Sequence, residues 1–190
     1  EKQMAGTDQK LAAAAPPAAI KQHILQYVGS APAGNNHAAD TAGTIGTIIR
    51  TPSVSEAVLT QLTKEGFAVK QISYNPDLLD VTLPSSAGIS KADKIKILEQ
   101  VKDNIFWLNV AGNQVTDEQL SVIKNFSNLQ RLRLDNNPVT DGGIKALLTL
   151  SSLESINLCY TNITEACLAD LSTMKSLQSV YTWGTPVKET

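Results

Sequence analysis

An apolar pattern that returns every 24 residues through the range 104–190 constrains the fold more than any other feature of the sequence. Two series of aliphatic residues keep this step: Leu108, Leu132, Ile156 and Val180, and Val115, Val139, Ile163 and Val187. A fixed period of about 20 to 50 residues is typical of proteins built from stacked supersecondary units. The pattern therefore predicts an internal repeat.

The spacing inside one unit indicates its secondary structure. Leu132 and Leu134 are separated by one residue, as on one side of a strand, whereas Ile144 and Leu147 are spaced as on one face of a helix. A single strand and helix cannot bury their apolar sides alone, so the units must stack on one another. We expect an α/β fold: a short solenoid with a parallel sheet on one side and helices on the other.

Three helix starts are marked by a threonine followed by an acid: Thr116-Asp117, Thr140-Asp141 and Thr164-Glu165. The hydroxyl suits an N-cap and the carboxylate suits the positive end of the helix dipole. Gln119 would complete a capping box with Thr116. Because these acids recur at the repeat step without a partner for acid–base chemistry, we interpret them as structural.

The range 51–103 is less regular, and we interpret it as an N-terminal repeat and cap that belongs to a solenoid over 51–190. The expected elements are a helix over 53–65 that ends at Gly66, strands over 68–74 and 78–83 joined by a turn at 75–77, and a helix over 90–102. The last unit stops after Val187, before any helix, as a terminal unit would.

Residues 1–50 form a different kind of segment, rich in Ala, Pro and Gly. One helix is expected over 16–28, and the range 29–47 is expected to be a linker. The first residue is Glu1 rather than Met, so we expect natural sequence upstream of it, while the C-terminus is expected to be the natural one.

Composition and reactive residues argue against several functions. The formal charge is −2 with no basic run, and no apolar run is long enough for a membrane span, so we expect neither nucleic acid nor membrane contact by this chain. The pattern places Cys159 on the outward side of a strand and Cys167 in a helix. Because the two side chains would then point away from each other, we expect no disulfide between them. His23 and His37 stand alone. We therefore expect no catalytic residue, metal or cofactor.

A candidate interaction surface is predicted on the outward side of the strands. Residues between the buried strand positions would form it: Trp107, Arg131, Arg133, Asn157, Tyr181 and Trp183. Trp, Tyr and Arg are enriched in the parts of protein interfaces that contribute most to binding. Two interpretations remain open. This surface binds a protein, or a short and nearly flat sheet merely exposes some aromatic residues or covers them with the N-terminal segment or a crystal neighbour.

The repeat units resemble a known class. The stretches VTDEQLSVIKNFSNLQRLRLDNN and VTDGGIKALLTLSSLESINLCYTN resemble the leucine-rich repeats of bacterial proteins with the ribonuclease-inhibitor-like fold. The departures are Gly142-Gly143 in place of Ala-Gly, and Cys167 at a position that usually holds Gly. The range 52–190 also resembles the C-terminal region of bacterial membrane-anchored c-type cytochromes of the planctomycete type.

The resemblance implies a setting for the chain. It implies a periplasmic or other extracytoplasmic protein, tethered to a membrane through upstream sequence. The haem attachment motif Cys-x-x-Cys-His is absent here, so any haem would belong to an upstream domain. The expected function is a non-catalytic module for protein–protein interaction or scaffolding, with a separate protein or its own upstream domain as partner. The alternatives are an accessory tail of a cytochrome and a purely structural tail.

Overall fold

The computed structural model describes residues 25–26, 51–85 and 91–187. Their strands form one seven-stranded sheet. The order of strands is β1-β7-β6-β5-β4-β3-β2, so β1 and β2 are the two edges of an open sheet. β2 runs antiparallel to β3, and the other neighbouring pairs are parallel. The expected α/β class, with strands and helices alternating along a mostly parallel sheet, is confirmed.

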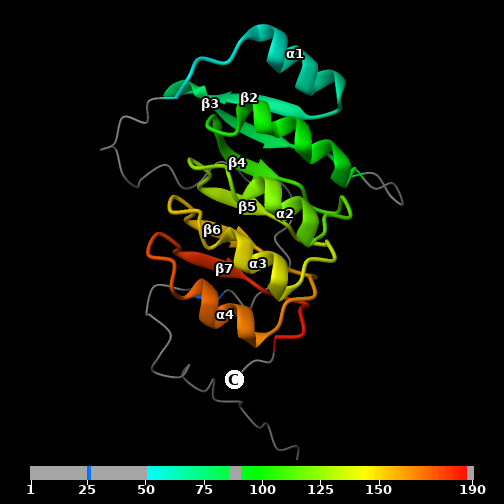
Figure 1. The fold of residues 1–190 in the computed structure, drawn as a ribbon, viewed down its shortest axis with the longest axis vertical. Coiled ribbons are helices and arrows are strands. Elements are labelled where there is room, and N and C mark those ends of the chain that lie inside the picture. Colours follow the sequence, from blue (N-terminus) through cyan, green and yellow to red (C-terminus); the bar gives the residue numbers. More distant parts are fainter. Residues whose placement is uncertain (1–24, 27–50, 86–90, 188–190) are drawn as a thin grey trace, which may run out of the picture.

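Short strands and helices alternate from β3 onward (Figure 1). The strands are β1 (Leu25–Gln26), β2 (Ala68–Ile72), β3 (Asn75–Thr82), β4 (Ile105–Asn109), β5 (Arg131–Arg133), β6 (Ser155–Asn157) and β7 (Ser179–Tyr181). The helices are α1 (Glu56–Lys64), the 3-10 helix η1 (Ala92–Val101), α2 (Asp117–Ile123), α3 (Asp141–Leu147) and α4 (Glu165–Leu171). η1, α2, α3 and α4 pack against one another in this order.

The parallel strands pair in the register that the repeat predicts. Leu108 lies opposite Leu132, Leu132 opposite Ile156, and Ile156 opposite Val180. These four side chains are at most 2% exposed. Each fully buried large aliphatic side chain stabilises the fold by about 1.5 to 3 kcal/mol, so this aliphatic ladder contributes strongly to stability.

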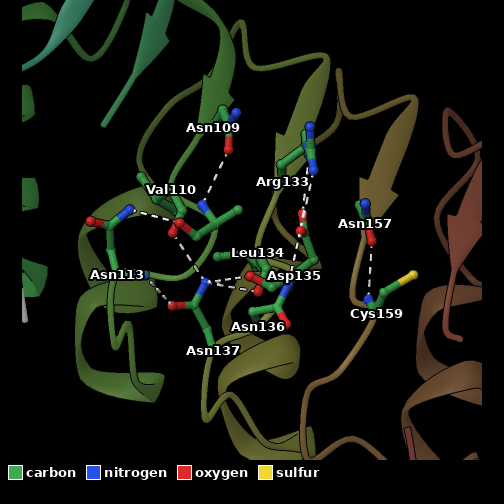
Figure 2. A network of polar contacts seen from close by, with 11 residues as sticks. Asn109, Val110, Asn113, Arg133, Leu134, Asp135, Asn136, Asn137, Asn157 and Cys159 are labelled. Carbon is green, nitrogen blue, oxygen red and sulfur yellow. Dashed lines mark hydrogen bonds and ion pairs between the residues drawn. The ribbon is translucent and has the colours of Figure 1, made fainter. Parts of the chain in front are cut away.

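A second ladder, made of buried polar side chains, closes the turn after each strand. Asn113, Asn137 and Thr161 are 24 residues apart and at most 3% exposed. The Asn137 side chain accepts the backbone N–H of Asn113 at 3.1 Å, and its amide donates to the carbonyl of Leu134 at 2.8 Å (Figure 2). It also accepts the backbone N–H of Val115 at 2.9 Å. Because buried backbone groups need partners, this asparagine fixes two neighbouring turns together.

The acids at the helix starts bind the following unit. The Asp117 carboxylate accepts the backbone N–H of Thr140 at 2.9 Å and its hydroxyl at 2.5 Å, and Asp141 accepts the same two groups of Thr164 at 2.7 and 2.5 Å. The Gln119 side chain accepts the Thr116 backbone N–H at 3.0 Å, as the expected capping box requires. Asp117 and Asp141 therefore join successive units, a role that the sequence did not indicate.

The range 51–103 differs from its expected boundaries. Helix α1 begins at Glu56 rather than at residue 53, because the Ser55 hydroxyl accepts the N–H of Val58 as the N-cap. The turn between β2 and β3 lies at residues 73–74, so the expected turn at 75–77 is wrong and Pro76 lies in β3 near its start. Proline is tolerated there because the β2–β3 register is irregular over this stretch, where Ile72 pairs with Asn75 but Gln71 pairs with Leu79.

The expected helix over 90–102 is a 3-10 helix, η1. Its buried residues, Ala92, Ile95, Leu98 and Val101, recur every three residues. A 3-10 helix has 3.0 residues per turn, so it places all four on one side, whereas an α-helix would spread them around its axis. Residues 86–90 lie outside the described part of the chain.

The N-terminal predictions fall mostly outside the described residues. This applies to the expected linker and to the helix over 16–28, except at Leu25–Gln26. These two residues form β1, which pairs in parallel with β7, so a helix is wrong there. The physical reason is that β7 presents an unpaired strand edge, and backbone groups on such an edge readily accept another strand.

The C-terminal unit is less completely buried than the units before it. Thr182, at the position of the core residue Leu158 in the unit before, is 7% exposed. Leu168 is half-buried, although the equivalent Ile144 is fully buried. Among the described residues no helix follows α4, so Leu168 lacks a neighbouring helix of the kind that α4 provides for α3, the helix of Ile144.

Candidate interaction surface

The candidate surface is the outward face of the sheet, defined as the face opposite α2, α3 and α4 (Figure 1). The strand register places the expected side chains in two rows on it. The first row is Trp107, Arg131, Ser155 and Ser179, and the second is Asn109, Arg133, Asn157 and Tyr181. Five of the six predicted surface residues therefore lie in these two rows, and their role in binding stays a prediction.

Aromatic residues gather around Trp107 at one end of the outward face. We call Tyr74, Phe106, Trp107 and Arg131 the Trp107 cluster. The Arg131 guanidinium lies 5.0 Å from the centre of the Trp107 ring, a cation–π distance. The Phe106 ring lies 5.9 Å from Trp107 and 6.3 Å from Tyr74. Tyr74 is 69% exposed and forms the accessible part of the cluster.

Phe106 reaches the outward face because β4 is irregular at this residue. Leu79 pairs with Ile105 but Asp80 pairs with Trp107, so Phe106 is an extra residue in the ladder. It packs on Ile72 and is 4% exposed. Simple alternation would put Phe106 in the main core with Leu108, and nothing in the apolar pattern signals the bulge.

The hydroxyl of Tyr74, in the Trp107 cluster, is affected by two nearby charges. Burial raises the pKa of the Tyr74 hydroxyl, the positive charge of Arg131 lowers it, and the negative charge of Glu154 raises it. The hydroxyl therefore lies within electrostatic reach of both charged residues. A ligand group placed beside Tyr74 would experience the same two charges.

The Trp183 cluster, formed by Tyr160 and Trp183, lies at the other end of the outward face. The two rings meet edge to face at 4.7 Å and 82°, and the residues are 44% and 41% exposed. Tyr160 has a φ of 54°, in the left-handed region. This position recurs every 24 residues and holds Gly112, Asn136 and Gly184 in the other units.

The left-handed backbone aims Tyr160 at Trp183. An added Cβ at Gly184 would lie 2.5 Å from the Tyr160 ring, so glycine is required there for the two turns to stack. The prediction from sequence missed Tyr160. The glycine and asparagine at equivalent positions could have signalled it, because these residue types favour a left-handed turn.

The middle of the outward face is polar and mostly paired within the chain. Arg133 binds Asp135 through two hydrogen bonds of 3.0 and 3.2 Å, and Asp135 is 8% exposed. Asn157 is 7% exposed, and its side chain accepts the backbone N–H of Cys159 at 3.0 Å (Figure 2). Of the predicted surface residues, Asn157 therefore has a structural task and Arg133 is held in place by a carboxylate.

Both cysteines are free and buried. Cys167 lies in the core as expected, and burial, followed by the nearby charge of Asp141, raises its pKa to about 12. Cys159 lies on the outward side as expected but is 6% exposed. Burial raises the pKa of its thiol, against a backbone hydrogen bond from Trp183 that lowers it. Neither thiol is activated as a nucleophile.

We expect both thiols to resist alkylation at pH 8 in the folded chain and to react rapidly in guanidinium. Since the folded pKa of Cys167 lies above its ordinary value of 9.0, unfolded thiols ionise first as pH rises. The contribution of Cys167 to folding stability is then fully present below pH 9 and is lost between pH 9 and about 12. Alkylation kinetics and denaturation at several pH values measure this, with Cys167→Ala as the control. Alkylation of the folded chain at the rate observed in guanidinium would contradict this expectation.

Neither a metal cluster nor a membrane span is found in the part of the chain that the structure describes. Among residues 25–26, 51–85 and 91–187, no group of three or more His, Cys, Asp or Glu side chains is placed to hold a metal ion. The helices of the described chain include none with the length and apolar character needed to cross a membrane.

Comparison of the chain with models of protein families gives no match, and comparison with curated proteins gives none either.

Proposed function

We propose that this chain is a non-catalytic leucine-rich-repeat module that binds another protein through the outward face of its sheet. The observation that carries the proposal is the pair of aromatic clusters, around Trp107 and Trp183, at opposite ends of this face. The repeat class is supported by the 24-residue step, the strand–helix units and the buried ladders.

The chemistry of the outward face suits a protein partner. Exposed Tyr and Trp side chains bring large apolar area with few rotatable bonds, and Arg131 adds directed hydrogen-bond donors. The clusters lie three strands apart in the sheet order, on β4 and just after β7. At about 4.8 Å per strand, their separation across the sheet is roughly 14 Å, within the reach of a short extended peptide.

The setting that we propose is a larger extracytoplasmic bacterial protein, tethered to a membrane by upstream sequence. Its support is the resemblance of residues 52–190 to the C-terminal region of membrane-anchored cytochromes. Haem would then reside in the upstream domain. A second candidate is a structural tail that packs on its own upstream sequence, and the pairing of β1 with β7 favours it.

Replacing the Trp183 cluster should abolish partner binding with little effect on the fold. Tyr160→Asn keeps a residue that tolerates the left-handed backbone, as Asn136 does, and Trp183→Ala removes a side chain that is 41% exposed. We expect the double variant to lose partner affinity by about 30-fold, as for an interface hot spot of about 2 kcal/mol, and to change stability by less than about 1 kcal/mol.

The measurement is quantitative mass spectrometry of proteins captured from a bacterial periplasmic extract, followed by affinity determination for the enriched protein. Lys145→Ala combined with Glu118→Ala is the matched control, because both side chains lie on the helical side of the sheet. Equal capture by the wild type and the Tyr160/Trp183 variant would refute the proposed surface, and a loss with the control variant would point to the helices instead.

A further inference from the structure

The two ends of the sheet differ in how well they resist the addition of a strand. At one end, β2 carries Lys70 at its centre, and this side chain is exposed. A lysine on an edge strand discourages pairing with another chain, because pairing would remove water from its charge. At the other end, β7 consists of Ser179, Val180 and Tyr181, without a charged residue. The residue types therefore permit strand addition at the β7 end.

The backbone of β7 has hydrogen-bonding groups on the side away from β6. Ser179 donates its N–H to the Glu154 carbonyl at 3.0 Å, directly before β6. The Tyr181 carbonyl accepts the Leu158 N–H at 2.8 Å, directly after β6. Successive residues of a parallel ladder direct their backbone groups to alternate sides. The N–H and the carbonyl of Val180 therefore lie on the opposite side, where β1 pairs with β7.

β1 occupies this side as a short strand with an unfavourable residue type. It forms two registered pairs with β7: Leu25 with Ser179, and Gln26 with Val180. Neighbouring strands from β4 to β7 form three pairs each. The register position beside Val180 continues the aliphatic ladder, whose members are at most 2% exposed. Apolar burial favours an aliphatic residue at such a position over the polar Gln26, so β1 is a weak occupant of the edge.

We propose that the β7 edge is a binding site for an extended segment of a partner protein, which displaces β1 and pairs in parallel with β7, with an aliphatic residue beside Val180. Recognition rests on main-chain hydrogen bonds to β7 and on the burial of one aliphatic side chain. β1 is then a competitor that reduces the apparent affinity by the fraction of molecules in which it has left the edge. The site uses the backbone of β7 and not the aromatic clusters, so it does not depend on the proposed function.

A peptide that copies a strand of this sheet is the probe. Its sequence, LESINL, is that of residues 153–158, and it carries Ile156, the ladder residue of β6. The matched control peptide has the change Ile156→Gln. With the full chain, we expect fluorescence anisotropy of the labelled peptides to show binding at least about tenfold tighter for the isoleucine peptide, as for the burial of one aliphatic side chain.

Variants of β1 test the competition. In the pair of Leu25 with Ser179, the N–H of Leu25 must bond across, because Ser179 bonds toward β6. Leu25→Pro removes this donor and should raise the apparent affinity of the isoleucine peptide about threefold or more. Gln26→Ile gives β1 the aliphatic residue of the ladder and should lower the affinity by a similar factor.

Hydrogen exchange locates the peptide. We expect the isoleucine peptide to protect the Val180 amide in the Leu25→Pro variant. The proposal is overturned if the two peptides bind equally or not at all, if both β1 variants leave the affinity unchanged, or if protection appears in β2 instead of β7. Dimerisation that rises with protein concentration and is abolished by the peptide, measured by analytical ultracentrifugation, would assign the edge to a second copy of the chain and would also overturn it.

Discussion

Asn137→Ala is expected to destabilise the fold by about 3 to 5 kcal/mol. The side chain is 3% exposed and accepts two buried backbone N–H groups, those of Asn113 and Val115, which would lose their acceptor. Each buried donor without a partner costs about 1 to 3 kcal/mol, and the lost bond to the Leu134 carbonyl adds to this. Chemical denaturation monitored by circular dichroism measures the change.

The matched control for this effect is Asn162→Ala. Asn162 lies in an equivalent turn one unit later, but its side chain is exposed. Its removal should change stability by no more than about 0.5 kcal/mol. If Asn137→Ala behaves like Asn162→Ala, the buried polar ladder does not hold the turns together.

Leu134→Ala is expected to cost about 2 to 5 kcal/mol, as large-to-small changes in a packed core do. Leu134 is fully buried in the main core, and its backbone N–H donates to the Asn157 carbonyl of the next strand at 2.9 Å. Alanine keeps that backbone bond, so the loss reports the packing alone. Urea denaturation of both proteins measures the difference.

Leu168→Ala provides the comparison at the end of the repeat. Leu168 is half-buried on the last helix, so we expect a smaller loss than at Leu134. Equal losses at the two sites would mean that the terminal unit is covered as fully as the central one. A loss below about 0.5 kcal/mol at Leu134 would be typical of a surface position and would refute its place in the core.

The repeat could be predicted because its signals are periodic. The aliphatic step defines which strand residues are buried, and the threonine–acid pairs define where helices begin. The roles of Asp117 and Asp141 escaped prediction since each carboxylate binds the threonine of the following unit, 23 residues away. Such a contact depends on how units stack, which spacing within one unit does not reveal.

The candidate surface was predictable in its rows and not in its details. Trp107 and Trp183 follow from strand alternation, but Phe106 joins them through a bulge and Tyr160 through a left-handed turn. Both irregularities break the period that was used for prediction. The pairing of Arg133 with Asp135 was likewise hidden, because it depends on side-chain conformation rather than on residue step.

NMR scalar couplings across hydrogen bonds measure the strand register, on which the buried ladders and the outward face both depend. We expect a coupling from the Leu134 N–H to the Asn157 carbonyl and one from the Leu158 N–H to the Tyr181 carbonyl. Couplings displaced by one residue would turn buried side chains of the shifted strand to the opposite face and would refute this register.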